Sequence, residues 1–281
     1  MLNRNYLQLF PSIFFTRKIT KDISTNIQYV RRVNRPSYQQ QNPFIEYLDS
    51  LTYTKGNPLI RPEISDQFKI GLTYQNQPFF SISHNKTTDV IFENAPKQDG
   101  NLTFTTPENL AQFNNVVFEL NFPLNIGKKI TGFGGNQFIW NSYKADYLGG
   151  VYDRKKWNWQ SYWQVAYKPC PDWNFEISGF YTTVFLNEFI TISELGNLNF
   201  AIQKSILEKK GRITLNFNDV TFSHKTRGQL QYQIIDLSFH QWSEIRNVRL
   251  SFTYSFGNQK LQASRSRSTG SDAESNRVKT N

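Results

Sequence analysis

Hydrophobic and polar residues alternate strictly in segments of about ten residues, and turns separate these segments. The last segment is the clearest. Its apolar positions are Val248, Leu250, Phe252, Tyr254 and Phe256, and its polar positions are Asn247, Arg249, Ser251, Thr253 and Ser255. Successive side chains of a β-strand point to opposite faces, so this segment predicts a strand that is apolar on one face and polar on the other.

The same pattern recurs along most of the chain. Clear versions cover residues 67–75, 118–126, 157–168 and 174–185. Weaker versions cover residues 7–15, 23–29, 80–92, 130–143, 198–206 and 213–217. Helical periodicity is absent, so the sequence predicts an all-β protein with about eleven strands.

The connections between these strands alternate in length. Short turns are expected at residues 20–22, 75–78, 127–129, 169–172 and 208–211. Longer connections are expected at residues 34–63, 93–112, 145–156 and 187–197. Antiparallel transmembrane β-barrels have short periplasmic turns and long extracellular loops, and we therefore predict that fold.

The C-terminal part of the chain needs separate treatment. Residues 231–239 resemble a strand, but counting them as a spanning strand would end the last strand on the extracellular side. We therefore interpret residues 219–246 as a loop that contains a β-like excursion. Residues 1–256 are predicted to be the barrel segment, and residues 257–281, which have few groups to bury, a disordered tail.

Composition supports this fold. Aromatic residues make up 16% of the chain although its mean hydropathy is −0.56, as expected when rings occupy one face of polar strands. The longest apolar runs fall far short of the roughly 18 residues that a membrane helix needs, which excludes a helical membrane protein. The net charge of +10 is spread over turns and loops, so we do not predict nucleic-acid binding. Cys170 is the single cysteine and forms no internal disulfide.

No catalytic or metal-binding constellation is visible, and we predict a protein that is not an enzyme and has no cofactor. The three histidines, His84, His224 and His240, lack metal-ligand spacing. Ser223 and His224 are adjacent, and adjacent residues of a regular strand point to opposite faces. A polar loop pair is therefore a better interpretation than a catalytic pair.

The first residues, Met1 to Phe15, do not read as a secretion signal. Gln8, Pro11 and Ser12 interrupt the apolar stretch, and no small-residue cleavage site follows. We therefore expect the chain to be a fragment of a longer protein.

Several motifs resemble an outer-membrane β-barrel family related to TonB-dependent receptors. The block from Arg31 to Tyr74 carries Arg35-Pro36, Asn42-Pro43-Phe44, Gly56-Asn57-Pro58 and Arg61-Pro62-Glu63, and a strand follows at once. Asn218-Asp219-Val220 resembles the penultimate-strand motif of the family, and residues 246–257 resemble its closing strand. Leu59-Ile60 departs from the pattern, because the family more often has Asn-Leu there.

The resemblance implies a location and a set of partners. Members form 22-stranded barrels in the outer membrane, so eleven strands would be the C-terminal half of one barrel. The implied partners are outer-membrane lipid, the rest of the barrel, a plug domain, an energy-transducing inner-membrane complex and an extracellular lid protein. The implied function is nutrient uptake, and the substrate stays open.

Two groups of candidate residues follow. The first is an extracellular loop motif that several prolines stiffen. It comprises Arg35, Pro36, Asn42, Pro43, Gly56, Asn57, Pro58, Pro62 and Glu63. This loop either contacts substrate or a lid protein, or it serves structural closure, which we favour. The second group is polar residues expected to face the lumen, namely Lys69, Glu119, Gln164, Glu176 and Arg249.

Three other readings stay open. A binding or adhesion barrel would use the loops without transport, and a lipid-modifying enzyme would need the catalytic residues that the sequence lacks. A soluble β-sandwich would bury the apolar faces in a dry interior. The tryptophans at 157, 159, 163 and 173 and Tyr181 either stack on a sugar or form an aromatic girdle at the lipid interface, and we favour the girdle.

Overall fold

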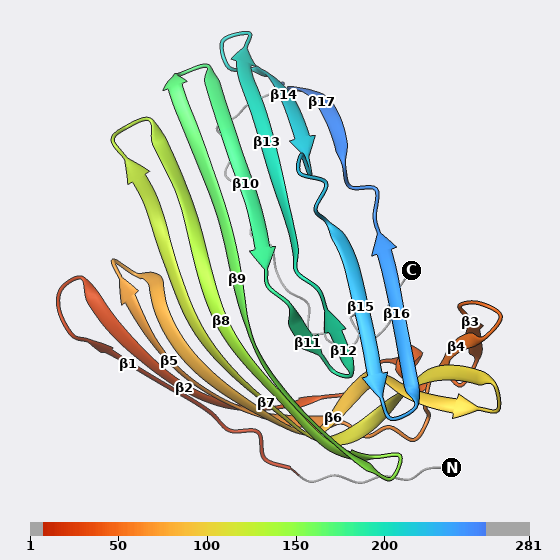
Figure 1. Ribbon diagram of the computed structural model, residues 1–281. Helices are drawn as coiled ribbons and strands as arrows, with labels where there is room; N and C mark the ends of the chain where they lie inside the picture. The colour runs from red at the N-terminus through yellow and green to blue at the C-terminus, as the bar shows by residue number, and fades with distance from the viewer. Residues whose placement is uncertain (1–7, 257–281) are drawn as a thin grey trace. The chain divides into compact units, whose positions relative to one another are not determined.

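The computed structural model describes residues 8–256, and nearly all of them lie in β-strands and turns (Figure 1). Eleven strands form one continuous hydrogen-bonded order. They are β1 (Ser12–Lys18), β2 (Ile23–Asn34), β5 (Glu63–Tyr74), β6 (Gln77–Asp99), β7 (Leu102–Ile126), β8 (Ile130–Tyr147), β9 (Gly150–Cys170), β10 (Trp173–Thr182), β13 (Leu195–Ile206), β14 (Gly211–Asn218) and β17 (Asn247–Tyr254). The prediction of about eleven antiparallel strands is confirmed, although β1 begins at Ser12 and not near residue 7.

Smaller elements fill three of the connections. The β2–β5 connection holds α1 (Tyr38–Gln41), β3 (Ile45–Tyr47) and β4 (Thr52–Lys55). A second sheet has the order β11 (Phe185–Asn187), β12 (Ile190–Ile192), β15 (Lys225–Tyr232) and β16 (Ile235–Trp242). The β-like excursion predicted within residues 219–246 is therefore a hairpin, β15–β16, outside the main strand order. No helix among residues 8–256 has the length and apolar character needed to cross a membrane.

Two of the predicted long connections are wrong. Residues 93–112 and 145–156 continue the strands on either side and end in two-residue turns at residues 100–101 and 148–149. Gly100 and Gly149 have φ of +60° and +75°, and positive φ is what tight hairpin turns of this kind require. Pro96 and Pro107 lie inside these extensions, and prolines usually indicate a loop. The predicted short turns are all confirmed.

The chain divides into two compact units. The first contains residues 8–118 and Trp140–Lys156, and the second contains Glu119–Ile139 and residues 157–256. Strands β7, β8 and β9 contribute to both units. The first seven residues and the predicted tail at 257–281 lie outside the described residues.

Buried apolar residues gather in the regions beyond the regular hairpins. In the first unit, the ring of Tyr143 stacks on Phe113 at 4.5 Å and meets Phe92 edge-on at 5.3 Å. In the second unit, buried side chains lie on the small sheet. They are Leu186, Phe189, Ile192, Leu230, Tyr232 and Ile235.

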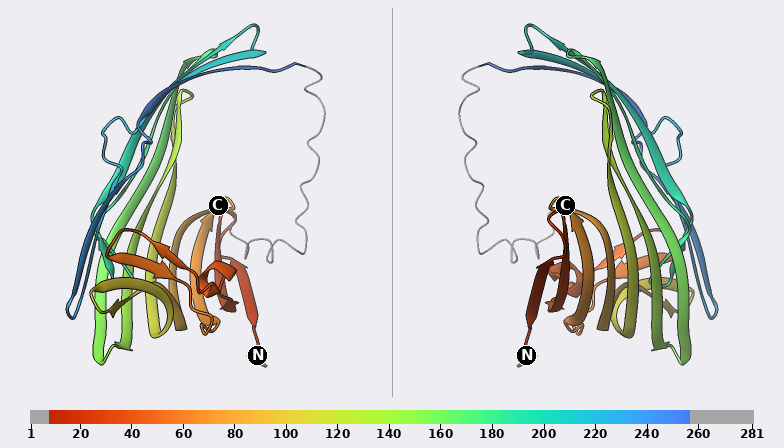
Figure 2. Two further views of the ribbon diagram at one scale, coloured as in Figure 1. Left: turned by 90° about the vertical axis from the view of Figure 1, so that its right-hand side faces the viewer. Right: turned by 90° about the vertical axis from the view of Figure 1, so that its left-hand side faces the viewer.

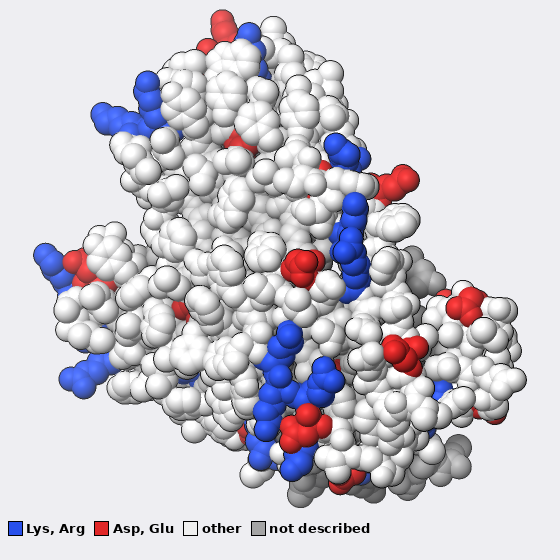
Figure 3. All heavy atoms as spheres, in the orientation of Figure 1, with Lys and Arg blue, Asp and Glu red and all other residues white. Residues whose placement is uncertain are grey.

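The alternating strands themselves keep their apolar side chains on the surface. Phe68 is 45% exposed and Leu250 is 71% exposed. Register places apolar residues beside one another, as in the row Ile27, Ile70 and Ile82 across β2, β5 and β6. Charged side chains are sparse over β9, β10 and β13 on the face seen in Figure 3. This arrangement contradicts the β-sandwich alternative, which would bury these residues in a dry interior.

Candidate functional site

The long connection of residues 35–62 is folded onto the extended ends of β6 and β7. β4 pairs in parallel with β7, with Tyr53 opposite Phe104. The backbone N–H of Thr103 donates to the carbonyl of Leu51 at 3.0 Å, and the Thr54 hydroxyl donates to the carbonyl of Thr105 at 3.3 Å. Figure 2 shows the β3–β4 hairpin beside the end of the β6–β7 hairpin. The connection is thus an ordered loop with its own strand pairing.

Gly56 and Asn57 close this loop from inside. The N–H of Gly56 donates to the carbonyl of Asn42 at 2.8 Å, and the N–H of Asn57 donates to the carbonyl of Gln40 at 2.7 Å. The Asn57 amide also donates to the carbonyl of Pro107 on β7 at 3.0 Å. A Cβ at position 56 would lie 2.3 Å from the Asn42 carbonyl oxygen, so only glycine fits this approach.

The start of the loop is held by a helix cap. Pro36 is buried, and Ser37 caps the single turn α1 with a reciprocal pair of hydrogen bonds to Gln40. The Gln40 amide donates to the Glu93 carboxylate at 3.0 Å. Arg35 is exposed and lines a smaller cavity with Arg61, Pro62 and Asp89.

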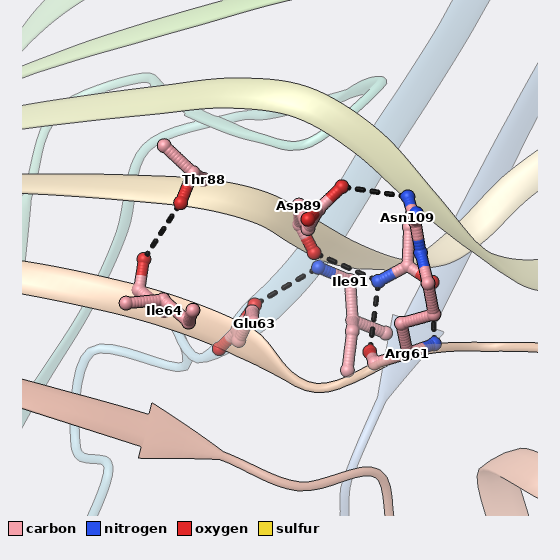
Figure 4. A network of polar contacts seen from close by, with 7 residues as sticks. All are labelled: Arg61, Glu63, Ile64, Thr88, Asp89, Ile91 and Asn109. Atoms are coloured by element: carbon pink, nitrogen blue, oxygen red, sulfur yellow. Dashed lines mark hydrogen bonds and ion pairs between the residues drawn. The ribbon is translucent and has the colours of Figure 1, made fainter. Parts of the chain in front are cut away.

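The end of the loop is anchored by a polar network around Asn109 (Figure 4). The Asn109 side chain accepts from the N–H of Arg61 at 2.6 Å and donates to the carbonyls of Arg61 at 2.9 Å and Asp89 at 2.8 Å. The Arg61 guanidinium pairs with the Asp89 carboxylate at 2.7 Å. The Glu63 carboxylate accepts from the N–H of Ile91 at 2.9 Å. Arg61-Pro62-Glu63 therefore fixes the loop on β6 and β7.

These contacts leave a cavity of about 570 Å³ beside the loop, lined by loop residues and by β6 and β7. The Tyr53 and Phe104 rings stack at 4.8 Å, and the Lys55 ammonium lies 4.5 Å from the centroid of Phe104. Burial raises the pKa of the Tyr53 phenol, with a smaller contribution from Asp99, so its hydroxyl stays neutral. Lys97 and Glu108 form an ion pair at the wall. Lys55 has no ion-pair partner among residues 8–256 and presents its charge to the cavity.

The tip of the β3–β4 hairpin carries exposed apolar side chains. Tyr47 is 67% exposed, Leu48 is 66% exposed and Leu51 is 58% exposed. The Asp49 carboxylate stabilises the turn by accepting from the N–H groups of Leu51 and Thr52 and from the Thr52 hydroxyl. The Thr52 hydroxyl, followed by the backbone N–H groups, lowers the pKa of Asp49. This apolar tip is a surface suited to contact with another molecule.

The structure brings most of the predicted loop motif together. Gly56 contacts Asn42, Asn57 contacts Gln40 and Pro107, and Pro43 and Pro58 line the cavity. Sequence reasoning missed Lys55, Asp89 and Asn109. Asp89 and Asn109 could have been noticed in the sequence, because each is a carboxylate or an amide at a position where the alternation of apolar residues stops.

The candidate lumen residues lie on the regular strands and not in the loop. Lys69 is opposite Gln28 and Ser83, and Glu119 accepts from the amides of Asn121 and Gln137. Gln164 is opposite Ser178, Glu176 is opposite Ala166 and Ala201, and Arg249 is opposite Asn216. That their common polar faces line a lumen remains a proposal.

Ser223 and His224 contact separate groups. The Ser223 hydroxyl donates to the carbonyl of Gly196 at 3.0 Å, and the His224 ring lies edge-on to Phe180 at 5.9 Å. Both backbone N–H groups donate to the buried carboxylate of Asp219. The pair holds a loop in place. No group of three or more potential metal ligands occurs within the described part of the chain.

Comparison with known proteins gives a consistent result. The profile of the outer membrane protein beta-barrel family matches residues 1–254. No curated protein matches the sequence. Among solved structures, the siderophore receptor PirA from Pseudomonas aeruginosa is similar, with a TM-score of 0.55 and 10% identity over 75% of this chain and 38% of that one.

Two further structures are similar at low identity. The FrpB iron transporter from Neisseria meningitidis has a TM-score of 0.53 and 16% identity, and the match covers 89% of this chain and 39% of that one. The ferric enterobactin receptor PfeA from Pseudomonas aeruginosa has a TM-score of 0.52 and 13% identity, with coverages of 77% and 35%. This chain thus spans well under half the length of the structures that it matches, and the likeness shows the fold.

Proposed function

Because the chain belongs to the outer membrane protein beta-barrel family, we propose that it is the C-terminal half of a plugged outer-membrane receptor that takes up a scarce nutrient. The protein lies in the outer membrane, where lipid contacts the exposed apolar faces of its strands.

The observation that carries this proposal is the strand order, which begins at β1 and ends at β17. Within the described residues, β1 and β17 each pair with one neighbour in this order, so the other edge of each strand is left without a partner. Unpaired backbone groups cost several kcal/mol each in lipid, so both edges need further strands. Eleven is half the number of strands in a 22-stranded barrel. The chain also matches only 38% and 39% of the length of two solved structures of similar fold, which supports a partial barrel.

The ligand that we propose is an anionic iron complex of a siderophore. Similar structures are named as siderophore receptors and as an iron transporter. The cavity beside the loop of residues 35–62 offers the Lys55 charge next to the Phe104 ring, which favours an anionic ligand. A plug domain and an energy-transducing inner-membrane complex would complete transport. An extracellular lid protein would contact the apolar tip of the β3–β4 hairpin.

The test is uptake by cells that express the complete gene during iron limitation. Lys55→Gln is expected to weaken binding of an anionic ferric siderophore to purified outer membranes about tenfold, the amount of one desolvated charge contact. Lys128→Gln, in the short turn between β7 and β8, makes the same charge change away from the loop and serves as the control. If Lys55→Gln and the unaltered protein bound the ferric siderophore equally well, the cavity beside the loop would not be the ligand-binding site.

A second candidate function is a binding or adhesion barrel without transport, and the exposed apolar tip of the β3–β4 hairpin favours it. Dissipating the inner-membrane proton gradient distinguishes the two functions. A receptor loses accumulation of ligand inside the cell and keeps surface binding. An adhesion barrel shows surface binding alone in both conditions.

A further inference from the structure

A cluster of one aromatic ring and two cations lies where β14 ends and β17 begins, far along the chain from the loop of residues 35–62. The Lys225 ammonium is 3.8 Å from the centroid of the Phe222 ring, and the Arg246 guanidinium carbon is 5.2 Å from it. Phe222 comes from the β14–β15 connection and Arg246 from the β16–β17 connection. These two connections run next to each other, and Lys and Arg side chains gather over the second (Figures 1 and 3).

The two cations have no acidic partner within the described residues. The ion pairs there join other residues, and neither Glu244 nor Asp219 pairs with Lys225 or Arg246. The buried Asp219 carboxylate instead accepts from the backbone N–H groups of Ser223 and His224. Two positive charges held within reach of one ring repel each other. An anion between them would relieve that repulsion.

The cluster borders an apolar groove of about 420 Å³. Phe217, Val220, Val248 and the Arg246 side chain line this groove, together with Asn218 and Asn247, whose side chains hydrogen-bond to each other. Register places Phe217 directly opposite Val248, and the next pairs along the same face are Leu215 with Leu250 and Ile213 with Phe252. The groove therefore continues into a stripe of paired apolar side chains along β14 and β17.

The cluster lies at one end of this apolar stripe. Lys204 lies at the other end of the same face, opposite Ile213, and its ammonium is 4.9 Å from the centroid of the Trp173 ring. A cation next to an aromatic ring therefore flanks the stripe at both ends.

We infer that Phe222, Lys225 and Arg246 bind the phosphate-bearing headgroup of an anionic membrane lipid, whose acyl chain lies along Phe217, Val248 and Leu250. The two cations hold the phosphate, and the Phe222 ring orients them. The apolar groove accepts the first part of the chain, so headgroup and tail are recognised at one place. This site is independent of the proposed ligand cavity and of transport.

Fluorescence quenching by brominated lipid tests the inference on the whole protein. Trp242 is directly opposite Lys225 and is 69% exposed, so it reports on lipid at this place once the other five tryptophans are replaced by phenylalanine. In phosphatidylcholine vesicles that contain brominated phosphatidylglycerol, the double variant Lys225→Gln/Arg246→Gln should weaken the preference for the anionic lipid about thirtyfold. The control Lys209→Gln/Lys210→Gln makes the same charge change in the turn between β13 and β14 and should keep the preference.

Three results would overturn the inference. The first is an unchanged preference in the Lys225/Arg246 variant, and the second is an equal loss in the control. The third is full displacement by inorganic phosphate with no preference for lipid, which would indicate a free-anion site. The exchange Lys225→Arg/Arg246→Lys keeps both charges and should retain the preference, which separates loss of binding from loss of folding.

Discussion

Gly56 shows how closely single residues determine the loop of residues 35–62. Alanine at this position would place its Cβ 2.3 Å from the Asn42 carbonyl oxygen and 2.7 Å from the Gln40 carbonyl oxygen, and both atoms belong to backbone. The loop must move, at a cost of about 1–3 kcal/mol. We expect Gly56→Ala to make trypsin cleave after Lys55 several times faster in folded protein.

Gly100→Ala is the matched control for this prediction. Gly100 lies in the nearby β6–β7 turn and has φ +60°, and a methyl group added there would meet no other atom within 4 Å, so alanine adds backbone strain alone. Cleavage after Lys55 should stay near the rate of the unaltered protein. Equal acceleration by both substitutions would show that the close approach at Gly56 does not hold the loop.

The β3–β4 hairpin contains a carboxylate whose titration can be followed by itself. The Thr52 hydroxyl and two backbone N–H groups lower the pKa of Asp49, so its charged form stabilises the turn. This contribution is fully present above the ordinary aspartate value of about 3.9 and is lost as pH falls through the lowered value. Carboxyl-carbon NMR should show Asp49 titrating below that ordinary value.

Thr52→Val removes the hydrogen bond that lowers the Asp49 pKa most, and it should raise the titration midpoint of Asp49 toward the ordinary value. Ser50→Ala, in the same turn, removes a hydroxyl that does not contact the carboxylate and should leave the midpoint in place. If Thr52→Val left the titration midpoint of Asp49 unchanged, the backbone N–H groups alone would account for its lowered pKa.

At the scale of elements, alternation predicted the strands because lipid outside and polar groups inside impose a period of two. The prediction failed at residues 93–112 and 145–156, where the strands continue beyond the regular pattern. There apolar residues such as Phe104, Tyr147 and Tyr152 are buried within the first unit. That packing, and not a membrane, selects their positions, so the strict alternation stops while the hydrogen-bonded ladder continues.

The site was predictable in part for a related reason. Proline, glycine and asparagine have local conformational requirements, and these made Asn42, Gly56 and Pro58 visible in the sequence. Asn109 and Asp89 act through contacts with residues 20 to 48 positions away, such as the Arg61 backbone. Lys55 becomes notable only because Phe104, from another strand, lies beneath it. Such contacts depend on register between distant strands, which composition and spacing do not encode.

At the scale of the whole molecule, strand direction determines what completes the barrel. Ten antiparallel steps separate β1 from β17, so both strands run in the same direction. A partner for either free edge must run the opposite way. A completing segment therefore begins and ends with strands of equal direction and contributes an odd number of strands. A second copy of this chain would place β17 parallel to β1, and it does not complete an antiparallel barrel.

The proposed half-barrel should behave differently by itself and when it is joined to the proposed upstream strands. Produced by itself, the chain leaves the edges of β1 and β17 unpaired in lipid, at several kcal/mol for each unmade hydrogen bond, and it should aggregate. Supplied with the upstream strands, it should form a barrel that migrates faster on a gel before heating than after. Omitting β17 from that combined protein should abolish the shift, because closure needs every strand. A heat-modifiable band from the chain of residues 1–281 by itself would contradict the need for further strands, since only closure of the sheet makes a barrel resist detergent.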